Sequence, residues 1–114
     1  MALVVETYRL TEAFPRDEKY GLVHQMRRAA VSIPSNIAEG YGRDHLGDYL
    51  RQLSIANGSL VELETQILIA GRIGYLRDDR GTRILSDIAG ISRMLAALKH
   101  ALKRRRNQVA TPAP

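Results

Sequence analysis

Residues 25–40 read QMRRAAVSIPSNIAEG and carry two stripes of side chains at helical spacing. The first stripe is apolar and recurs every three or four residues, as one face of a helix does: Val23, Met26, Ala30, Ile33 and Ile37. The second stripe is small and polar and lies roughly 110° further around the helix: Gln25, Ala29, Ser32, Asn36 and Glu39. Two such stripes predict a helix that packs against two different neighbours.

Pro34 interrupts the backbone of this predicted helix without interrupting its apolar spacing. A proline in a helix interior removes one amide hydrogen bond and costs about 3 kcal/mol. Because the spacing continues past it, we predict a single helix that is kinked at Pro34. The alternative is a helix that ends at Ile33 and a second helix that starts at Pro34.

The polar stripe needs hydrogen-bond partners if another helix covers it. We interpret Gln25, Ser32, Asn36 and Glu39 as a network between helices that fixes their register. A ligand site formed by these side chains is the alternative.

Similar periodicity predicts helices over about residues 3–12, 15–40, 44–74 and 79–106. Phe14-Pro15 separates the first two helices, Gly40 and Gly42 end the second, and Asp44 is the expected N-cap of the third. The third helix has an apolar seam with a seven-residue period, which favours shallow, nearly antiparallel crossing: Leu46, Tyr49, Leu53, Ala56, Leu60, Leu63, Ile67 and Ala70. The fourth has a similar apolar seam: Ile84, Ile88, Ile91, Leu95, Leu98 and Leu102. We therefore predict an all-α domain over residues 1–108, an antiparallel four-helix bundle with up-down-up-down topology. Residues 109–114 contain two prolines and no apolar period, and we expect a disordered tail.

The third helix carries more apolar residues than one seam requires. Ile55, Val61, Leu68 and Ile69 point away from the seam, toward what would be solvent in a monomer. Such a face is usually buried by a partner, so we predict a subunit interface here. The alternative is a helix that lies deeper between its neighbours.

Positive charge is concentrated near the C-terminus. The net charge is +5, and Lys99, Lys103, Arg104, Arg105 and Arg106 account for five positive charges. Lysine and arginine displayed on a helix neutralise phosphates without reading base sequence. The cluster therefore predicts contact with RNA or DNA. The alternative is a basic last turn that complements the helix dipole. For Arg27 and Arg28 we expect pairing with acids such as Glu39 or Glu64, on another helix or another subunit, rather than phosphate contact.

Catalytic and metal-binding patterns are not evident. The chain has no cysteine, and His24, His45 and His100 have no metal-ligand spacing. No phosphate-binding glycine loop or Gly-x-Ser-x-Gly turn occurs. We expect a non-catalytic protein without a cofactor. The first residues do not resemble a signal peptide and no apolar run approaches a membrane span, so we expect a cytoplasmic location.

Two segments resemble a known family. Residues Phe14 to Arg43, FPRDEKYGLVHQMRRAAVSIPSNIAEGYGR, resemble the signature of bacterial four-helix-bundle proteins encoded by intervening sequences of large-subunit ribosomal RNA genes. Residues Ile55 to Leu76, IANGSLVELETQILIAGRIGYL, resemble the second block of that family. The resemblance implies an all-α bundle that forms a ring, usually a homopentamer, with a poorly defined role linked to nucleic acid. A relative of the family is the accessory protein of diversity-generating retroelements, which binds nucleic acid and partners a reverse transcriptase. An adaptor that recognises such a partner protein is therefore the alternative function.

Overall fold

The computed structural model describes residues 2–76 and 79–110, and within those ranges every regular element is a helix. The elements are α1 (Ala2–Thr11), a short 3-10 helix η1 (Arg16–Glu18), α2 (Leu22–Tyr41), α3 (Leu46–Arg72) and α4 (Arg80–Ala110). None of these helices is both long enough and apolar enough to cross a membrane.

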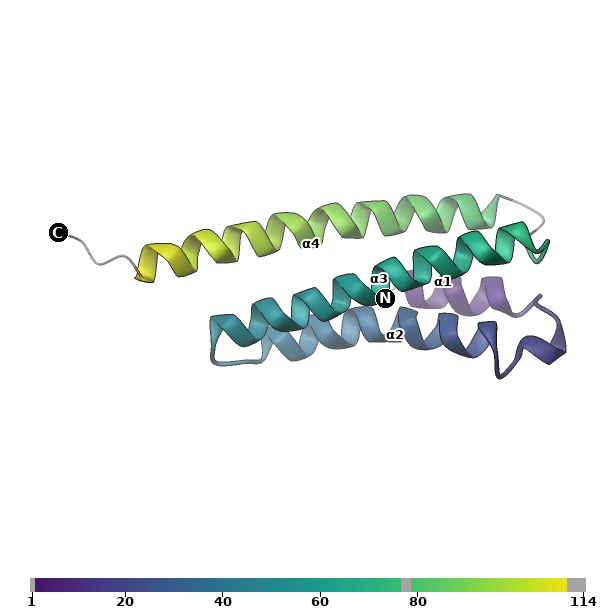
Figure 1. Ribbon diagram of the computed structural model, residues 1–114, viewed down its shortest axis with the longest axis horizontal. Coiled ribbons are helices and arrows are strands. Elements are labelled where there is room, and N and C mark those ends of the chain that lie inside the picture. The colour runs from purple at the N-terminus through teal and green to yellow at the C-terminus, as the bar shows by residue number, and fades with distance from the viewer. Residues whose placement is uncertain (1, 77–78, 111–114) are drawn as a thin grey trace.

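The four α-helices alternate in direction along one long axis (Figure 1). Contacts join α1 to α2, α2 to α3, α3 to α4 and α4 back to α1, whereas the diagonal pairs lie further apart. This arrangement confirms the antiparallel up-down-up-down bundle. With 10 residues against 31 in α4, α1 covers only one end of the bundle (Figure 1).

One aliphatic core runs through the bundle. Residues fully enclosed in it include Met26 of α2, Leu53, Leu60 and Leu63 of α3, and Ile84 and Ile88 of α4. These belong to the apolar seams that the helical spacing predicts. Each Å² of apolar surface that is removed from water stabilises the fold by about 25 cal/mol, and this burial is the main contribution that holds the helices together.

Pro34 lies inside one continuous helix, because α2 runs from Leu22 to Tyr41. The alternative of two helices divided between Ile33 and Pro34 is therefore wrong. Ile33 is buried on the apolar side of α2. Ile37, after the proline, also packs against the core, and burial of these apolar side chains helps to offset the missing backbone hydrogen bond.

The predicted helix boundaries differ from the observed ones at several ends. The second helix begins at Leu22 instead of 15, since Gly21 has a non-helical backbone (φ −99°, ψ −112°) that separates η1 from α2. The third helix begins at Leu46, and its N-cap is His45, with an extended backbone, rather than Asp44. Gly40 lies within α2 rather than after it.

The last helix is longer than predicted. It ends at Ala110 instead of 106 and so includes the first two residues of the predicted tail, while 111–114 lie outside the described residues. Neither proline nor glycine occurs between residues 91 and 110 to stop it. Loss of the apolar period did not end the helix, because residues without an apolar stripe can still extend an existing helix.

Candidate nucleic-acid interface

The C-terminal part of α4 holds the basic cluster, which comprises Lys99, Lys103, Arg104, Arg105 and Arg106. Lys99 is half-buried and the other four are exposed. Leu95 and Leu102 are buried and attach this part of α4 to the bundle. The end of α4 extends past the turn that joins α2 and α3, so its last turns have no helical neighbour at that point (Figure 1).

The charges of this cluster have few acidic residues on their own helix. Asp87 is the one acidic residue of α4, three turns before the cluster begins. Within the described part of the chain, the five basic residues take part in no ion pair. Lys99, Lys103 and Arg106 share one face by spacing, and Arg104 and Arg105 widen it. The result is a rod of positive charge at one end of the molecule.

The polar stripe divides into two parts. Ser32 Oγ and Ser59 Oγ are 2.8 Å apart and share a hydrogen bond between α2 and α3. Asn36 Nδ2 donates to the carbonyl and the hydroxyl oxygen of Ser32 at 2.7 and 2.9 Å. Glu39 lies outside this network and pairs with Arg43 one turn later.

The rest of the stripe faces a hollow between α2 and α3. Gln25 is exposed and lines this hollow of about 310 Å³ together with Arg28, Ser32, Ser59 and Glu62. In the polar stripe, Ser32 is therefore hydrogen-bonded to its neighbours, whereas Gln25 is exposed in the hollow.

The outer face of α3 is exposed in the single chain. Ile55, Val61, Leu68 and Ile69 are all at least 40% exposed, and Ile73 extends the same apolar surface. The alternative that this helix lies deeper between its neighbours is therefore wrong. Ile73 could have been included from the sequence, because it follows Ile69 by one turn.

Arg27 serves a different purpose from the one expected. Its Nε donates to Thr11 Oγ1 at 3.0 Å, and one Nη donates to the Tyr8 carbonyl at 3.3 Å. Its guanidinium carbon lies 4.5 Å from the centre of the Tyr8 ring. Within one chain, the expected pairing with Glu39 is wrong, because Glu39 pairs with Arg43. Arg27 instead joins α2 to α1.

Comparison with known proteins identifies the family. The profile of the family described as 23S rRNA-intervening sequence protein matches residues 1–97, which is most of the chain. This protein belongs to the 23S rRNA-intervening sequence protein family. The resemblance seen in residues 14–43 and 55–76 is thereby confirmed.

A solved structure shares the fold of this protein. It is a crystal structure of a protein of unknown function from the S23 ribosomal protein family of Bacteroides thetaiotaomicron. The TM-score is 0.74 at 22% identity, over 84% of this chain and 87% of that chain. At this identity the similarity shows the fold alone. No curated protein sequence matches this chain.

Two glutamines of α3 are buried, which the sequence does not predict. Gln52 and Gln66 of α3 are buried, and the Oε1 atom of each lacks a partner among the described groups. Gln66 Nε2 donates to Glu62 at 3.2 Å. Gln52 lies next to Gly40 of α2, so its burial depends on how closely α2 approaches α3.

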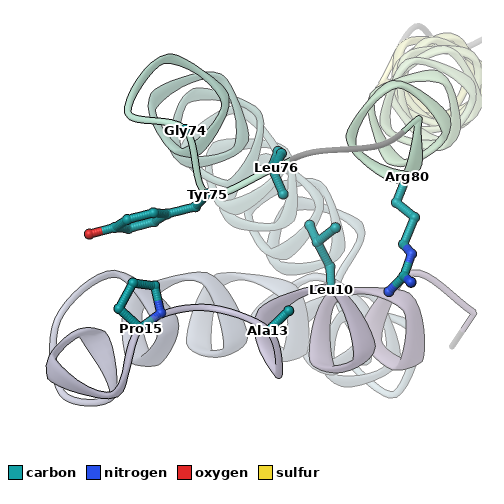
Figure 2. A pocket seen from close by; sticks show the side chains of 7 residues that line it. All are labelled: Leu10, Ala13, Pro15, Gly74, Tyr75, Leu76 and Arg80. Atoms are coloured by element: carbon teal, nitrogen blue, oxygen red, sulfur yellow. The ribbon is translucent and has the colours of Figure 1, made fainter.

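A pocket of about 370 Å³ lies at the end of the bundle where α1 leads into η1 and α3 leads into α4. Figure 2 shows Leu10 and Leu76 pointing toward each other between Tyr75 and Arg80. Hydrogen bonding to the Glu18 carboxylate, then burial and the charges of Glu18 and Asp17, raise the pKa of the Tyr75 phenol. The Tyr75 ring also packs on Phe14, with ring centres 5.2 Å apart. These contacts link the segment between α1 and α2 to the segment between α3 and α4.

Within residues 2–76 and 79–110, no group of three or more His, Asp or Glu side chains lies close enough together to hold a metal ion. The longest run of like charges among the described residues is at the basic end of α4, where residues 103–106 are all lysine or arginine.

Proposed function

We propose that this protein is a non-catalytic, cytoplasmic helical-bundle oligomer that binds RNA or DNA without sequence preference. The observation that carries the proposal is the basic cluster of α4, Lys99, Lys103 and Arg104 to Arg106. Four of its five side chains are exposed, and the end of α4 continues past the turn that joins α2 and α3 (Figure 1).

Charge distribution supports phosphate as the ligand. Outside the cluster, 12 lysine and arginine residues balance 12 acidic residues, so the body of the protein is neutral. A stretch of positive charge without ion-pair partners attracts a polyanion over about 10 Å at moderate salt. Such contacts release counterions and do not read bases, which supports binding without sequence preference.

Assembly would multiply this charge. The exposed apolar face of α3, from Ile55 to Ile73, supports an oligomer, and the family resemblance favours a pentamer. A ring would repeat the basic cluster on every subunit and raise the local positive potential. Affinity for a long nucleic acid would then exceed that of one subunit through multivalent contact.

The proposal is tested by removing charge at the cluster. Changing Lys103, Arg104, Arg105 and Arg106 to Gln keeps helix-forming side chains and should weaken binding of a structured RNA at least about tenfold at ~100 mM salt. The matched control changes four exposed arginines elsewhere, Arg9, Arg51, Arg83 and Arg93, to Gln. An equal fall in affinity in both variants would show that the cluster is not the binding surface.

An adaptor function is the second candidate. Its support is the apolar outer face of α3, which could receive a partner protein such as a nucleic-acid enzyme instead of another subunit. A partner protein bound through this face would still co-purify with the wild type after nuclease treatment. It would not co-purify with the Leu68→Glu variant. A partner that disappears with nuclease, while the subunit mass stays oligomeric, would exclude this candidate.

A further inference from the structure

A second concentration of basic side chains lies at the opposite end of α2 from the α2–α3 turn. A pocket of about 460 Å³ is formed there by α1, the turn after η1 and the first turns of α2. The side chains that give it its chemistry are Tyr8, Lys19, Tyr20, His24, Arg27 and Arg28. We refer to it as the Tyr20 pocket. Its volume lies within the range of about 300–1,000 Å³ that small-molecule sites occupy.

The Tyr20 pocket is basic, although the body of the protein that contains it is neutral overall. Its lining includes three lysine or arginine side chains and one histidine, and no acidic residue. Arg28 and Lys19 are exposed, and among the described residues neither takes part in an ion pair. The pocket therefore offers positive charge to an anionic group.

Arg27 gives this pocket a fixed cationic plane. Its hydrogen bonds to Thr11 and to the Tyr8 carbonyl, together with the Tyr8 ring against it, hold the guanidinium in place. Those two hydrogen bonds use two of its five N–H groups. A guanidinium held in this way can bind phosphate or stack on a base without first losing side-chain freedom.

Tyr20 supplies an aromatic surface beside these charges. Its side chain is 84% exposed, which is unusual for a ring that a folded protein could bury. Lys19 Nζ lies 5.4 Å from the ring centre. An exposed ring next to basic side chains is the combination with which proteins hold single-stranded nucleic acid, because the base stacks and the phosphate pairs.

We infer that the Tyr20 pocket binds one unpaired nucleotide of single-stranded RNA or DNA. The base stacks on Tyr20, and Lys19, Arg27 and Arg28 contact its phosphates. This contact is separate from the basic cluster of α4 and, resting on the proposed nucleic-acid function, adds a preference for unpaired nucleotides to the general attraction for phosphate. A base within a duplex remains stacked on its neighbours and cannot enter the pocket.

The test measures binding of a fluorescent ten-nucleotide single strand and of the matching duplex. Both are measured in the variant that has Gln at positions 103–106. Whether the basic cluster of α4 binds nucleic acid then does not affect the result. Tyr20→Ala should weaken binding of the single strand at least about fivefold, in keeping with the removal of one stacked base. It should leave binding of the duplex unchanged.

Tyr41→Ala is the matched control, because Tyr41 is 79% exposed at the other end of α2 and does not line the pocket. Its affinity should equal that of the background protein. Equal effects of Tyr20→Ala and Tyr41→Ala would overturn the inference, as would tighter binding of the duplex than of the single strand. An acidic peptide that binds in the pocket as tightly as the single strand, irrespective of Tyr20, would also overturn it, because charge alone would then explain the pocket.

Discussion

At the scale of single residues, Gly40 sets how closely α2 approaches α3. A Cβ atom at this position would lie 2.8 Å from the Cβ of Gln52 and 2.9 Å from Cδ1 of Tyr49. The sequence predicts Gly40 only as a helix stop, because the contact depends on the register between two helices. In contrast, Gly74 does end a helix, with φ of +87° and a Tyr75 amide that donates to the Ala70 carbonyl at 2.9 Å.

Gly40→Ala should therefore destabilise the protein by about 1–3 kcal/mol, since overpacking outweighs the gain in helix propensity. Gly90→Ala is the control, because a Cβ there meets only an Arg93 nitrogen at an ordinary 3.8 Å. It should stabilise α4 by about 0.5–1 kcal/mol. Urea unfolding of both variants measures this difference, and a Gly40→Ala protein as stable as the wild type would contradict the close approach.

Tyr75 predicts a specific pH dependence. Its pKa is raised in the folded protein, chiefly by hydrogen bonding to Glu18. Below about pH 10 the phenol is protonated in both the folded and the unfolded state, so its stabilising contribution is fully present. As the pH rises through the raised pKa, that contribution disappears and the free energy of unfolding falls. Tyr75→Phe keeps the ring and should show a smaller fall above pH 10, whereas equal slopes would contradict the assignment.

At the scale of elements, the apolar spacing predicts which faces of the helices pack. It does not predict where the helices begin and end. The buried residues Met26, Leu53 and Ile88 all fall on predicted faces. Helix ends were less predictable, because Gly21 and His45 adopt non-helical backbone conformations that apolar spacing does not reveal. The attachment of α1 through Arg27 was also missed, since its partners are a hydroxyl, a carbonyl and a ring rather than an acid.

Arg27→Gln should loosen α1 and lower the free energy of unfolding by about 1–2 kcal/mol, because it removes the hydrogen bonds and the ring packing that hold α1 to α2. In this variant, hydrogen exchange should become faster than in the wild type at residues 5–11, and the increase should be larger there than in α3. The adjacent Arg28→Gln is the control and should change stability by less than about 0.5 kcal/mol, since Arg28 is exposed. Unchanged exchange in α1 would show that Arg27 does not hold it.

At the scale of the whole molecule, the sequence predicts where positive charge is concentrated, and the structure shows which elements surround it. The basic cluster was predicted from residues 99–106 alone, because charge follows directly from residue type. The projection of α4 beyond the bundle was not, since it depends on a helix that continues to Ala110. The Tyr20 pocket was missed as well, because it brings together Tyr8 of α1, Lys19 and Tyr20 before α2, and Arg28 of α2.

The apolar face of α3 predicts the assembly state. Leu68→Glu places a charge on a surface that is 52% exposed in one chain, so the fold should persist while the oligomer dissociates. Met94→Glu is the control, because Met94 is 64% exposed on α4, outside that face. Sedimentation should give a lower mass for Leu68→Glu alone. A mass that is the same for both variants and the wild type would exclude the face as a subunit interface.

The most direct test of nucleic-acid binding at the basic cluster is the affinity for a structured RNA as a function of salt. Between about 50 and 200 mM salt, the logarithm of the wild-type binding constant should fall steeply and linearly with the logarithm of salt concentration. The variant with Gln at positions 103–106 should give a slope smaller by about one for each phosphate that it no longer neutralises. A flat slope for the wild type, or the same steep slope for the variant, would contradict binding through the end of α4.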